Sequence, residues 1–171
     1  MSIESSYNFR RVTDRLTTSG IVRPDQLKAL REQGYEVVVN LLPDTSEHAI
    51  ANERDVIESQ GIEYIHIPVD FKQPTSSDFL KFSGALDRVH EKKVHVHCAA
   101  NYRVSAFYSL YLVSRTVWSA EQAMEFICSI WQPTEHPAWS DFISGTLAQI
   151  SAHQDTPTTR GEGAAPTERK R

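Results

Sequence analysis

The chain of 171 residues contains only two cysteines, Cys98 and Cys128, and it has no long apolar run. Two thiols are too few for the disulfide framework that stabilises many small secreted domains. No stretch of about 18 apolar residues is present, so we expect no membrane partner. The first residues lack the basic and apolar regions of a signal peptide, so the expected location is cytoplasmic.

Positive charge is scarce as well, because 18 Lys and Arg residues stand against 22 Asp and Glu residues, for a formal net charge of −4. A protein that neutralises many nucleic-acid phosphates is usually basic, so no nucleic-acid partner is expected. His66 and His90 have no second ligand at the spacing typical of metal sites. We therefore expect neither a metal nor a cofactor.

Large apolar side chains are absent from the end of the chain. Residues 153–171 include no aromatic and no large aliphatic residue. Such a segment cannot bury enough apolar surface to offset the entropy lost on ordering, so we expect a disordered tail there. Residues 1–152 are long enough for one domain with its own core.

Within residues 1–152, strand-like and helix-like patterns alternate. Short strands are expected between residues 9 and 19, and buried strands at 37–42, 62–67 and 94–97. Helices are expected at 24–34, 48–60, 76–89, 103–115, 119–130 and 137–150. This alternation predicts an α/β fold, a mostly parallel sheet of about four to five strands flanked by helices on both faces.

Three polar residues, Asn40, Asp70 and Cys98, follow or end the predicted strands. In open parallel sheets, ligands bind beyond the carboxyl ends of the strands. These three residues are therefore expected to contribute to one site.

The segment VHVHCAANYRVSAF, residues 94–107, places a thiol where a buried strand turns into an apolar helix. A helix N-terminus has unpaired N–H groups, binds oxyanions and favours a thiolate. Arg103 adds a planar fork of donors that suits phosphate. Cys98 is thus a candidate nucleophile, Arg103 a candidate oxyanion clamp, and the loop residues Ala99, Ala100, Asn101 and Tyr102 are candidates for substrate binding.

This segment resembles the phosphate-binding loop of the cysteine-based protein tyrosine and dual-specificity phosphatases, whose signature is His-Cys, five residues, Arg, then Ser or Thr. His97 and Cys98 match, and Ser105 stands at the hydroxyl position. Arg103, however, follows the cysteine by five positions rather than six, and Val104 occupies the usual arginine position.

Two accounts of the early arginine remain open. The loop is one residue shorter, or it keeps its usual length and Arg103 approaches from the preceding position. Asn101 stands where the family usually has Gly, and Asn tolerates a left-handed backbone better than most residues. The spacing of Cys98 and Arg103 also resembles the active loop of single-domain rhodaneses.

The resemblance extends over roughly residues 7–143, including IWQPTEHPAW at 130–139. Over this range the chain is similar to a bacterial group of tyrosine-phosphatase-family proteins, in which the form HCAANxRVSAF is usual. The resemblance implies a dual-specificity-phosphatase-like fold and hydrolysis of phosphate monoesters. It also implies that Ser105 stabilises the leaving thiolate, that His97 orients the loop, and that Asn40 braces it.

A general acid is needed to protonate the leaving oxygen. Asp70 follows a predicted strand, and the related phosphatases keep their acid in a loop at that place. Asp78 is the main alternative. Among the other residues, we expect Trp131 and Trp139 in the core and Tyr102 at the pocket. Cys128 is also expected in the core, and Glu47 and Glu53 are expected to be solvated.

The sequence thus favours a phosphatase that acts through a phosphocysteine on Cys98, with a phosphorylated protein or a small phosphate ester as its partner. A non-catalytic module that binds phosphate or phosphoprotein is a second interpretation, favoured by the displaced Arg103. A rhodanese-like sulfurtransferase is a third, favoured by the four-residue gap and by small Ala99 and Ala100. His97 and the acid loop oppose it, because persulfide transfer needs no general acid.

Overall fold

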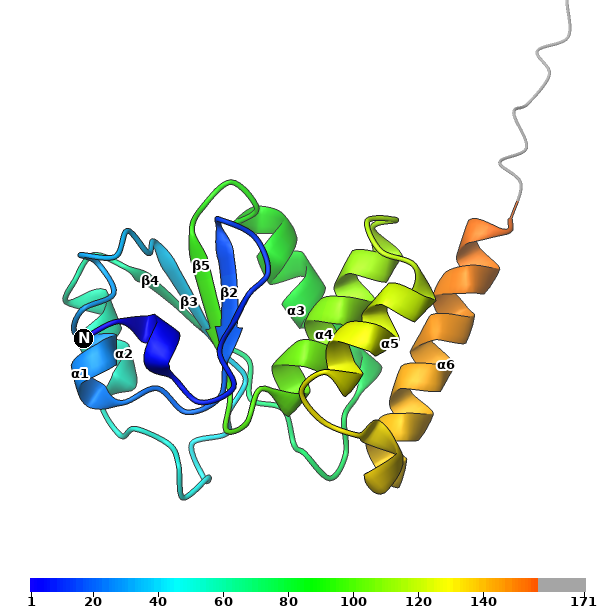
Figure 1. Ribbon diagram of the computed structural model, residues 1–171, viewed down its shortest axis with the longest axis horizontal. Coiled ribbons are helices and arrows are strands. Elements are labelled where there is room, and N and C mark those ends of the chain that lie inside the picture. The colour runs from blue at the N-terminus through cyan, green and yellow to red at the C-terminus, as the bar shows by residue number, and fades with distance from the viewer. Residues whose placement is uncertain (157–171) are drawn as a thin grey trace, which may run out of the picture.

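The computed structural model describes residues 1–156, and its centre is a five-stranded sheet (Figure 1). The strands are β1 (Arg10–Arg11), β2 (Leu16–Ser19), β3 (Val37–Asn40), β4 (Glu63–His66) and β5 (Val94–His97). Their order across the sheet is β1-β2-β5-β3-β4. Only β1 runs antiparallel to its neighbour, so the predicted α/β fold with a mostly parallel sheet is confirmed.

Strand β5 lies at the middle of the sheet, paired in parallel with β2 on one side and β3 on the other. Its last residue, His97, is in register with Ser19 of β2 and with Asn40 of β3. All four residues of β5 and all four of β3 are buried. Burial on both faces explains the continuous apolar run of β3, whereas β5 alternates Val with buried His.

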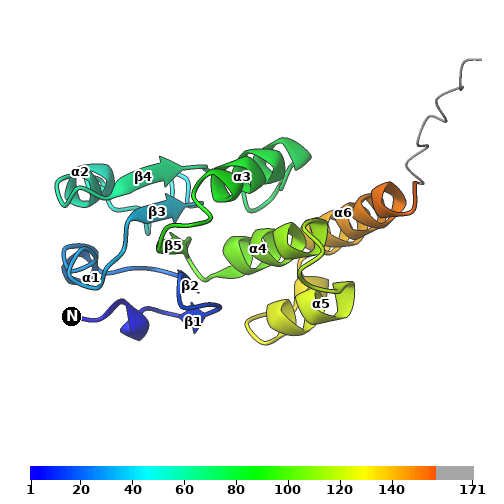
Figure 2. The same cartoon turned by 90° about the horizontal axis from the view of Figure 1, so that it is seen from above.

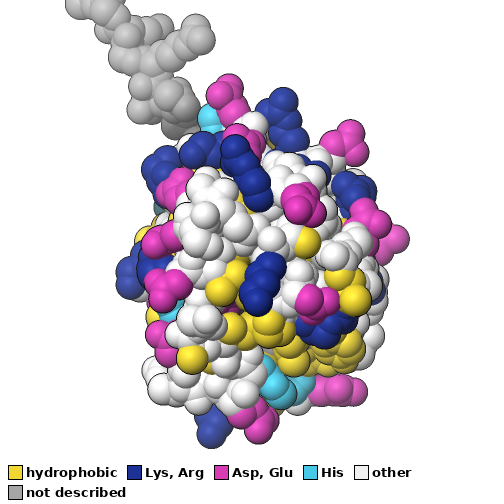
Figure 3. Space-filling view, turned by 90° about the vertical axis from the view of Figure 1, so that its left-hand side faces the viewer, with side chains coloured by type: hydrophobic (Ala, Val, Ile, Leu, Met, Phe, Trp, Pro, Cys, Tyr) yellow, Lys and Arg dark blue, Asp and Glu magenta, His cyan; other side chains and the backbone are white. Residues whose placement is uncertain are grey.

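Helices cover both faces of the sheet, as predicted (Figure 2). Helices α1 (Pro24–Leu27) and α2 (Glu53–Glu58) lie on one side, and on the other lie α3 (Ser76–Arg88), α4 (Tyr102–Ser114), α5 (Ala120–Cys128) and α6 (Pro137–Gln154). Short 3-10 turns occur at Ile3–Ser5 and Pro133–Glu135. On the side that bears α1 and α2, Lys and Arg side chains are interspersed with Asp and Glu (Figure 3).

Several helix boundaries differ from the prediction. The helices expected at 24–34 and 48–60 are shorter in the structure, where they correspond to α1 and α2. The rest of each segment consists of turns and irregular backbone. In the second segment, Ser59 bonds locally, since its Oγ donates to the Val56 carbonyl at 3.0 Å. Helix α3 is capped by Thr75, whose side chain accepts from the N–H of Asp78. Ser119 and Gln122 form a capping box at the start of α5.

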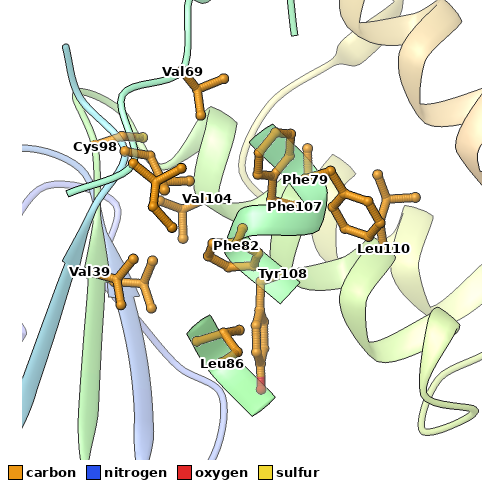
Figure 4. Packing of buried hydrophobic residues seen from close by; sticks show 14 of the residues in the cluster. Val39, Val69, Phe79, Phe82, Leu86, Cys98, Val104, Phe107, Tyr108 and Leu110 are labelled. Atoms are coloured by element: carbon orange, nitrogen blue, oxygen red, sulfur yellow. The ribbon is translucent and has the colours of Figure 1, made fainter. Parts of the chain in front are cut away.

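The core consists of two clusters, one on each face of the sheet. The larger joins the sheet to α3, α4 and α6 and includes Val39, Phe82, Cys98, Val104 and Phe107 (Figure 4). The smaller packs α1, α2 and the N-terminal turn against the opposite face, through Ile3, Leu27, Leu30, Val38 and Ile57. Neighbouring residues of β3 therefore enter different clusters, as the two-residue period of a strand requires.

Helix α6 continues to Gln154, two residues past the expected domain boundary. Residues 157–171, which make up most of the predicted tail, lie outside the described residues. Within residues 1–156, no helix is both long enough and apolar enough to cross a membrane.

A directional chain of buried hydrogen bonds links β2 to β5. Ser19 Oγ donates to the carbonyl of Gly20 at 2.9 Å, so His95 Nε2, 3.0 Å away, must donate to Ser19. His95 Nδ1 then accepts from Thr17 Oγ1 at 2.8 Å, and Thr17 accepts from the Tyr35 hydroxyl at 2.8 Å. Burial, with a smaller contribution from the neighbouring His97, holds the pKa of His95 well below its usual value, so the ring is neutral.

This neutral histidine predicts a fall in stability at mildly acidic pH. An unfolded histidine titrates near pH 6.5. Below that pH the unfolded chain therefore binds a proton that His95 does not bind in the folded protein. The free energy of unfolding should therefore fall by up to about 1.4 kcal/mol per pH unit from this group. In His95→Gln, urea denaturation should show lower stability at pH 7.5 but a shallower decline between pH 6.5 and 5. Equal slopes in the two proteins would contradict the prediction.

Gly20 directly follows β2 and contacts the turn that follows β5. Its N–H donates to the Tyr7 carbonyl at 2.7 Å, and it forms an isolated antiparallel bridge with Ala100. A Cβ at this position would lie 2.6 Å from the Ala99 oxygen and 2.9 Å from the Ala100 Cα. The backbones approach too closely for any larger residue.

We therefore predict that Gly20→Ala lowers the free energy of unfolding by about 1–3 kcal/mol, because the backbone of the turn must shift. Gly84→Ala is the matched control, since a Cβ on this exposed residue of α3 meets nothing within 4 Å. Alanine in that helix should stabilise the protein by about 0.5–1 kcal/mol. Urea unfolding of the three proteins measures both effects, and the same sign for both variants would refute the close-approach argument.

Candidate active site

The turn between β5 and α4 holds the candidate nucleophile. Strand β5 ends at His97, Cys98 follows directly, and α4 begins at Tyr102. Cys98 is fully buried and belongs to the larger core cluster, where Figure 4 shows it beside Val69 and Val104. The structure thus places the cysteine at the predicted strand-to-helix turn, with its side chain beneath the loop.

The turn is pinned to the N-terminal segment by two asparagines. Asn8 Nδ2 donates to the Ala100 carbonyl at 3.0 Å. In return, Asn101 Nδ2 donates to the Asn8 carbonyl at 2.8 Å and to Thr18 Oγ1 at 3.0 Å. Asn101 is buried and left-handed, with φ of 66°, so its predicted conformation is confirmed. These bonds fix the loop before any ligand arrives.

A group of backbone donors remains unpartnered at this turn. Among the described residues, no acceptor lies within hydrogen-bonding geometry of the N–H groups of Ala99, Ala100, Tyr102, Arg103 and Val104. Several of them form the first turn of α4, where helix geometry leaves N–H groups free and the helix dipole is positive. Such an arrangement is suited to an oxyanion.

Arg103 lies in the first turn of α4 and reaches the loop that follows β4. Its Nε donates to the Val69 carbonyl at 2.8 Å, and its guanidinium carbon lies 5.1 Å from the centroid of the Phe71 ring. Val104, at the position where the phosphatase signature has its arginine, is fully buried in the core. A guanidinium could not replace that valine, so Arg103 is the arginine available to this site.

The loop held by Arg103 contains Asp70. This carboxylate is exposed, and its Oδ1 accepts from the N–H of Lys72 at 2.9 Å. The alternative acid, Asp78, instead accepts a hydrogen bond from the Thr75 hydroxyl at 2.8 Å within the cap of α3. Asp70 is therefore the freer of the two carboxylates.

Aromatic rings support both loops from below. Trp139 is fully buried and donates from Nε1 to the Phe71 carbonyl at 2.8 Å, while Phe71 packs edge-on against His136 with ring centroids 5.1 Å apart. Tyr102 stacks on Trp131 at 4.7 Å with the planes 6° apart. Trp131 and Trp139 are core residues, as predicted, and Tyr102 is half-buried at the start of α4.

Ser105 is occupied by other partners. Its hydroxyl donates to the Tyr102 carbonyl at 3.1 Å and accepts from Trp131 Nε1 at 3.0 Å. Within residues 1–156, no hydrogen bond joins Ser105 to Cys98. In this arrangement Ser105 anchors Trp131, and its role toward the thiolate stays a prediction.

A buried carboxylate lies next to the site, and the expectation of a solvated Glu53 is wrong. Glu53 Oε1 is 2.5 Å from His97 Nε2, and Oε2 accepts from Asn40 Nδ2 at 3.1 Å. The Asn40 amide oxygen accepts from the N–H of Leu42 at 2.8 Å. The side chains of His97 and Glu53 are 3% and 5% exposed. Glu47, by contrast, is exposed as expected.

The sequence carried one indirect signal for Glu53. Asn40 and His97 end buried strands, so each needs a polar partner. Nothing in the local pattern of α2 identifies which residue supplies it.

The second thiol was also predicted wrongly. Cys128 is exposed, whereas Ala123 and Ile127 form the buried face of α5. Cys128 is one residue past Ile127, a rotation of about 100° around the helix, which turns its side chain outward.

Comparison with known proteins agrees with this architecture. Residues 8–124 match the family model of the beta-lactamase hydrolase-like protein, phosphatase-like domain. A candidate phosphatase (DUF442) from Shewanella putrefaciens CN-32 is 32% identical, with a TM-score of 0.74 over 86% of this chain and 91% of that one. Among curated proteins, none matches the chain.

More distant structures share the fold alone. TpbA of P. aeruginosa, in complex with pTyr, is 16% identical, with a TM-score of 0.64 over 84% of this chain and 90% of that one. The core catalytic domain of the PP-IP phosphatase SIW14 from S. cerevisiae is 15% identical, with a TM-score of 0.64 over 88% and 94%. The chain therefore belongs to the family of the beta-lactamase hydrolase-like protein, phosphatase-like domain, and it has a protein-tyrosine-phosphatase-like fold.

Proposed function

We propose that the protein is a cysteine-dependent phosphatase, of the tyrosine or dual-specificity type, that hydrolyses phosphate monoesters through a phosphocysteine on Cys98. The observation that carries the proposal is the turn itself. In the turn after Cys98, five N–H groups have no hydrogen-bond partner within residues 1–156, and Arg103 belongs to the first turn of the helix that follows. Ala99, Ala100, Asn101, Tyr102 and Arg103 would bind the phosphoryl oxygens.

In the first step, Cys98 Sγ attacks phosphorus and the bond to the leaving oxygen breaks. Asp70 donates a proton to that oxygen, so the alcohol or phenol departs neutral. In the second step, water attacks the phosphocysteine while the Asp70 carboxylate accepts its proton. The sulfur–phosphorus bond breaks, phosphate is released, and the Cys98 thiolate is restored. Ser105 donates a hydrogen bond to it once its hydroxyl turns away from the Tyr102 carbonyl.

Arg103 can hold the acid loop and the phosphoryl group at the same time. A guanidinium has five N–H donors, and only Nε–H is used by the Val69 carbonyl. The terminal nitrogens make no hydrogen bond within residues 1–156, so both can bind phosphoryl oxygens in a bidentate manner. One side chain would thus link the acid loop to the bound substrate.

A non-catalytic phosphate-binding module is the second candidate, because one observation favours it. Cys98 is fully buried, which a binding module tolerates and a nucleophile must overcome when substrate enters. Both functions use the same N–H groups, so phosphate binding alone does not separate them.

Replacement of the nucleophile separates them. Cys98→Ser should abolish release of phosphate from an aryl phosphate, because serine is not ionised at neutral pH, while orthophosphate should still raise the melting temperature. Cys128→Ser, which alters the exposed thiol, should keep full activity.

Other outcomes would identify the competing functions. Phosphate binding without turnover in the wild type would favour the module. Thiocyanate formation from thiosulfate and cyanide would favour the rhodanese-like sulfurtransferase.

The dependence of turnover on the leaving group tests whether Asp70 is the general acid. Asp70→Asn should slow turnover by roughly 10²–10⁴ for alkyl phosphates, which need a proton on the leaving oxygen. For p-nitrophenyl phosphate the loss should be much smaller, because nitrophenolate departs without a proton. Asp78→Asn is the matched control and should show no dependence on the leaving group. If Asp70→Asn slows both substrates equally, Asp70 is not the acid.

A further inference from the structure

Beneath the candidate loop, three buried polar side chains from three elements meet. Asn40 and His97 are the last residues of β3 and β5 and are paired in register. Glu53, from the first turn of α2, lies between their side chains and contacts both. All three are 4% exposed or less as whole residues. A buried carboxylate is costly unless its oxygens are well bonded, so this arrangement is specific.

The hydrogen bonds of this cluster determine which nitrogen of His97 carries a proton. The Asn40 amide orientation is fixed, because its oxygen accepts from the N–H of Leu42 and its nitrogen donates to Glu53 and to the Tyr64 hydroxyl. An ionised Glu53 can only accept. His97 Nε2, at 2.5 Å from Glu53, must therefore carry a hydrogen.

The other side of the imidazole has no such partner. Within the described part of the chain, His97 Nδ1 is buried without a hydrogen bond. A buried lone pair without a donor is tolerated better than a buried N–H without an acceptor. The carboxylate of Glu53 thus favours the His97 tautomer with its proton on Nε2, because this tautomer leaves only a lone pair, and no N–H, buried at Nδ1.

The side chain of Tyr64 adds no negative charge to the cluster. Burial, followed by the nearby Glu53 carboxylate, raises the pKa of Tyr64 to about 12, so its phenol keeps its proton. Within residues 1–156, the acceptor that the His97 ring contacts is Glu53.

We propose that Glu53 is a positioning residue of this site: it holds His97 with the proton on Nε2 and so fixes the backbone from which the Cys98 loop begins. The inference rests on the proposed phosphatase function. His97 and Cys98 share a peptide bond, so a shift of the His97 ring is passed directly to the nucleophile. Glu53 touches neither substrate nor thiol and acts only through His97.

Glu53→Gln should move the ring proton of His97 from Nε2 to Nδ1. The fixed Asn40 amide requires the glutamine oxygen, so the glutamine nitrogen faces His97 Nε2. His97 must then accept at Nε2 and place its proton on Nδ1, where no acceptor is found. We expect kcat to fall by roughly 10–100-fold, the usual effect of a small misplacement of a reacting group. KM should change little, because the phosphate-binding N–H groups remain.

An exchange variant tests the mechanism without a change in charge. In Asn40→Asp combined with Glu53→Gln, the aspartate accepts from Leu42, from Tyr64 and from the glutamine nitrogen. The glutamine oxygen then faces His97 again, and the proton returns to Nε2. Most of the lost kcat should be regained. Glu58→Gln is the control on the same helix, since within residues 1–156 Glu58 pairs only with exposed Arg54.

Two measurements separate positioning from a loss of stability. Kinetics are compared well below the melting temperature of each variant, where all of the protein is folded. The ¹⁵N chemical shifts of the His97 ring report which nitrogen is protonated. We expect Nε2–H in the wild type, Nδ1–H in Glu53→Gln and Nε2–H in the exchange variant.

Each result bears on one claim. If phosphate release survives Cys98→Ser, the proposed function fails. If release depends on Cys98 but Glu53→Gln keeps its kcat or its Nε2–H ring, the positioning role of Glu53 fails. If Glu53→Gln does not fold, the exchange variant decides alone. A folded, active exchange variant supports the proposal, and an inactive or unfolded one overturns it, because each hydrogen-bonded pair still joins one donor to one acceptor.

Discussion

The parallel pairing of β5 with strands on both sides is the constraint on which the site depends. It places the end of β5 between Ser19 of β2 and Asn40 of β3, so the loop after Cys98 is supported from two directions. On the β2 side, Gly20 and the paired asparagines hold the backbone of the loop. On the β3 side, the Glu53 cluster holds the strand end. Because the loop is supported on both sides, its backbone stays in place and its unpartnered N–H groups remain free to bind a ligand.

The two histidines of β5 show how the same side chain is accommodated in two ways. His95 and His97 lie on one face of the strand, with ring centroids 6.1 Å apart and planes 16° apart. His95 is surrounded by hydroxyl groups and remains neutral, whereas His97 is bound by a carboxylate. Within residues 1–156 no hydrogen bond joins these two polar networks, so each ring is held by its own partners.

The features that the sequence predicted well are those with a strong local pattern. The apolar strand before Cys98, the apolar helix after it and the left-handed Asn101 follow from adjacent residues and the backbone preferences of each type. The buried state of Glu53 depends instead on partners 13 and 44 residues away, so no local pattern contains it. Cys128 was misplaced because one position around a short helix separates the buried face from solvent. The roles of Asp70 and Ser105 depend on a bound substrate and stay predictions.

The contact between Arg103 and the acid loop has a consequence for how this scaffold can change. Arg103 Nε binds a backbone carbonyl, that of Val69, and not a side chain. Substitutions in the segment that follows can therefore alter its size and chemistry while the attachment to α4 persists. Grafting other sequences between Asp70 and Thr75 would therefore change this loop while Asp70, the proposed acid, and the turn after Cys98 stay unchanged.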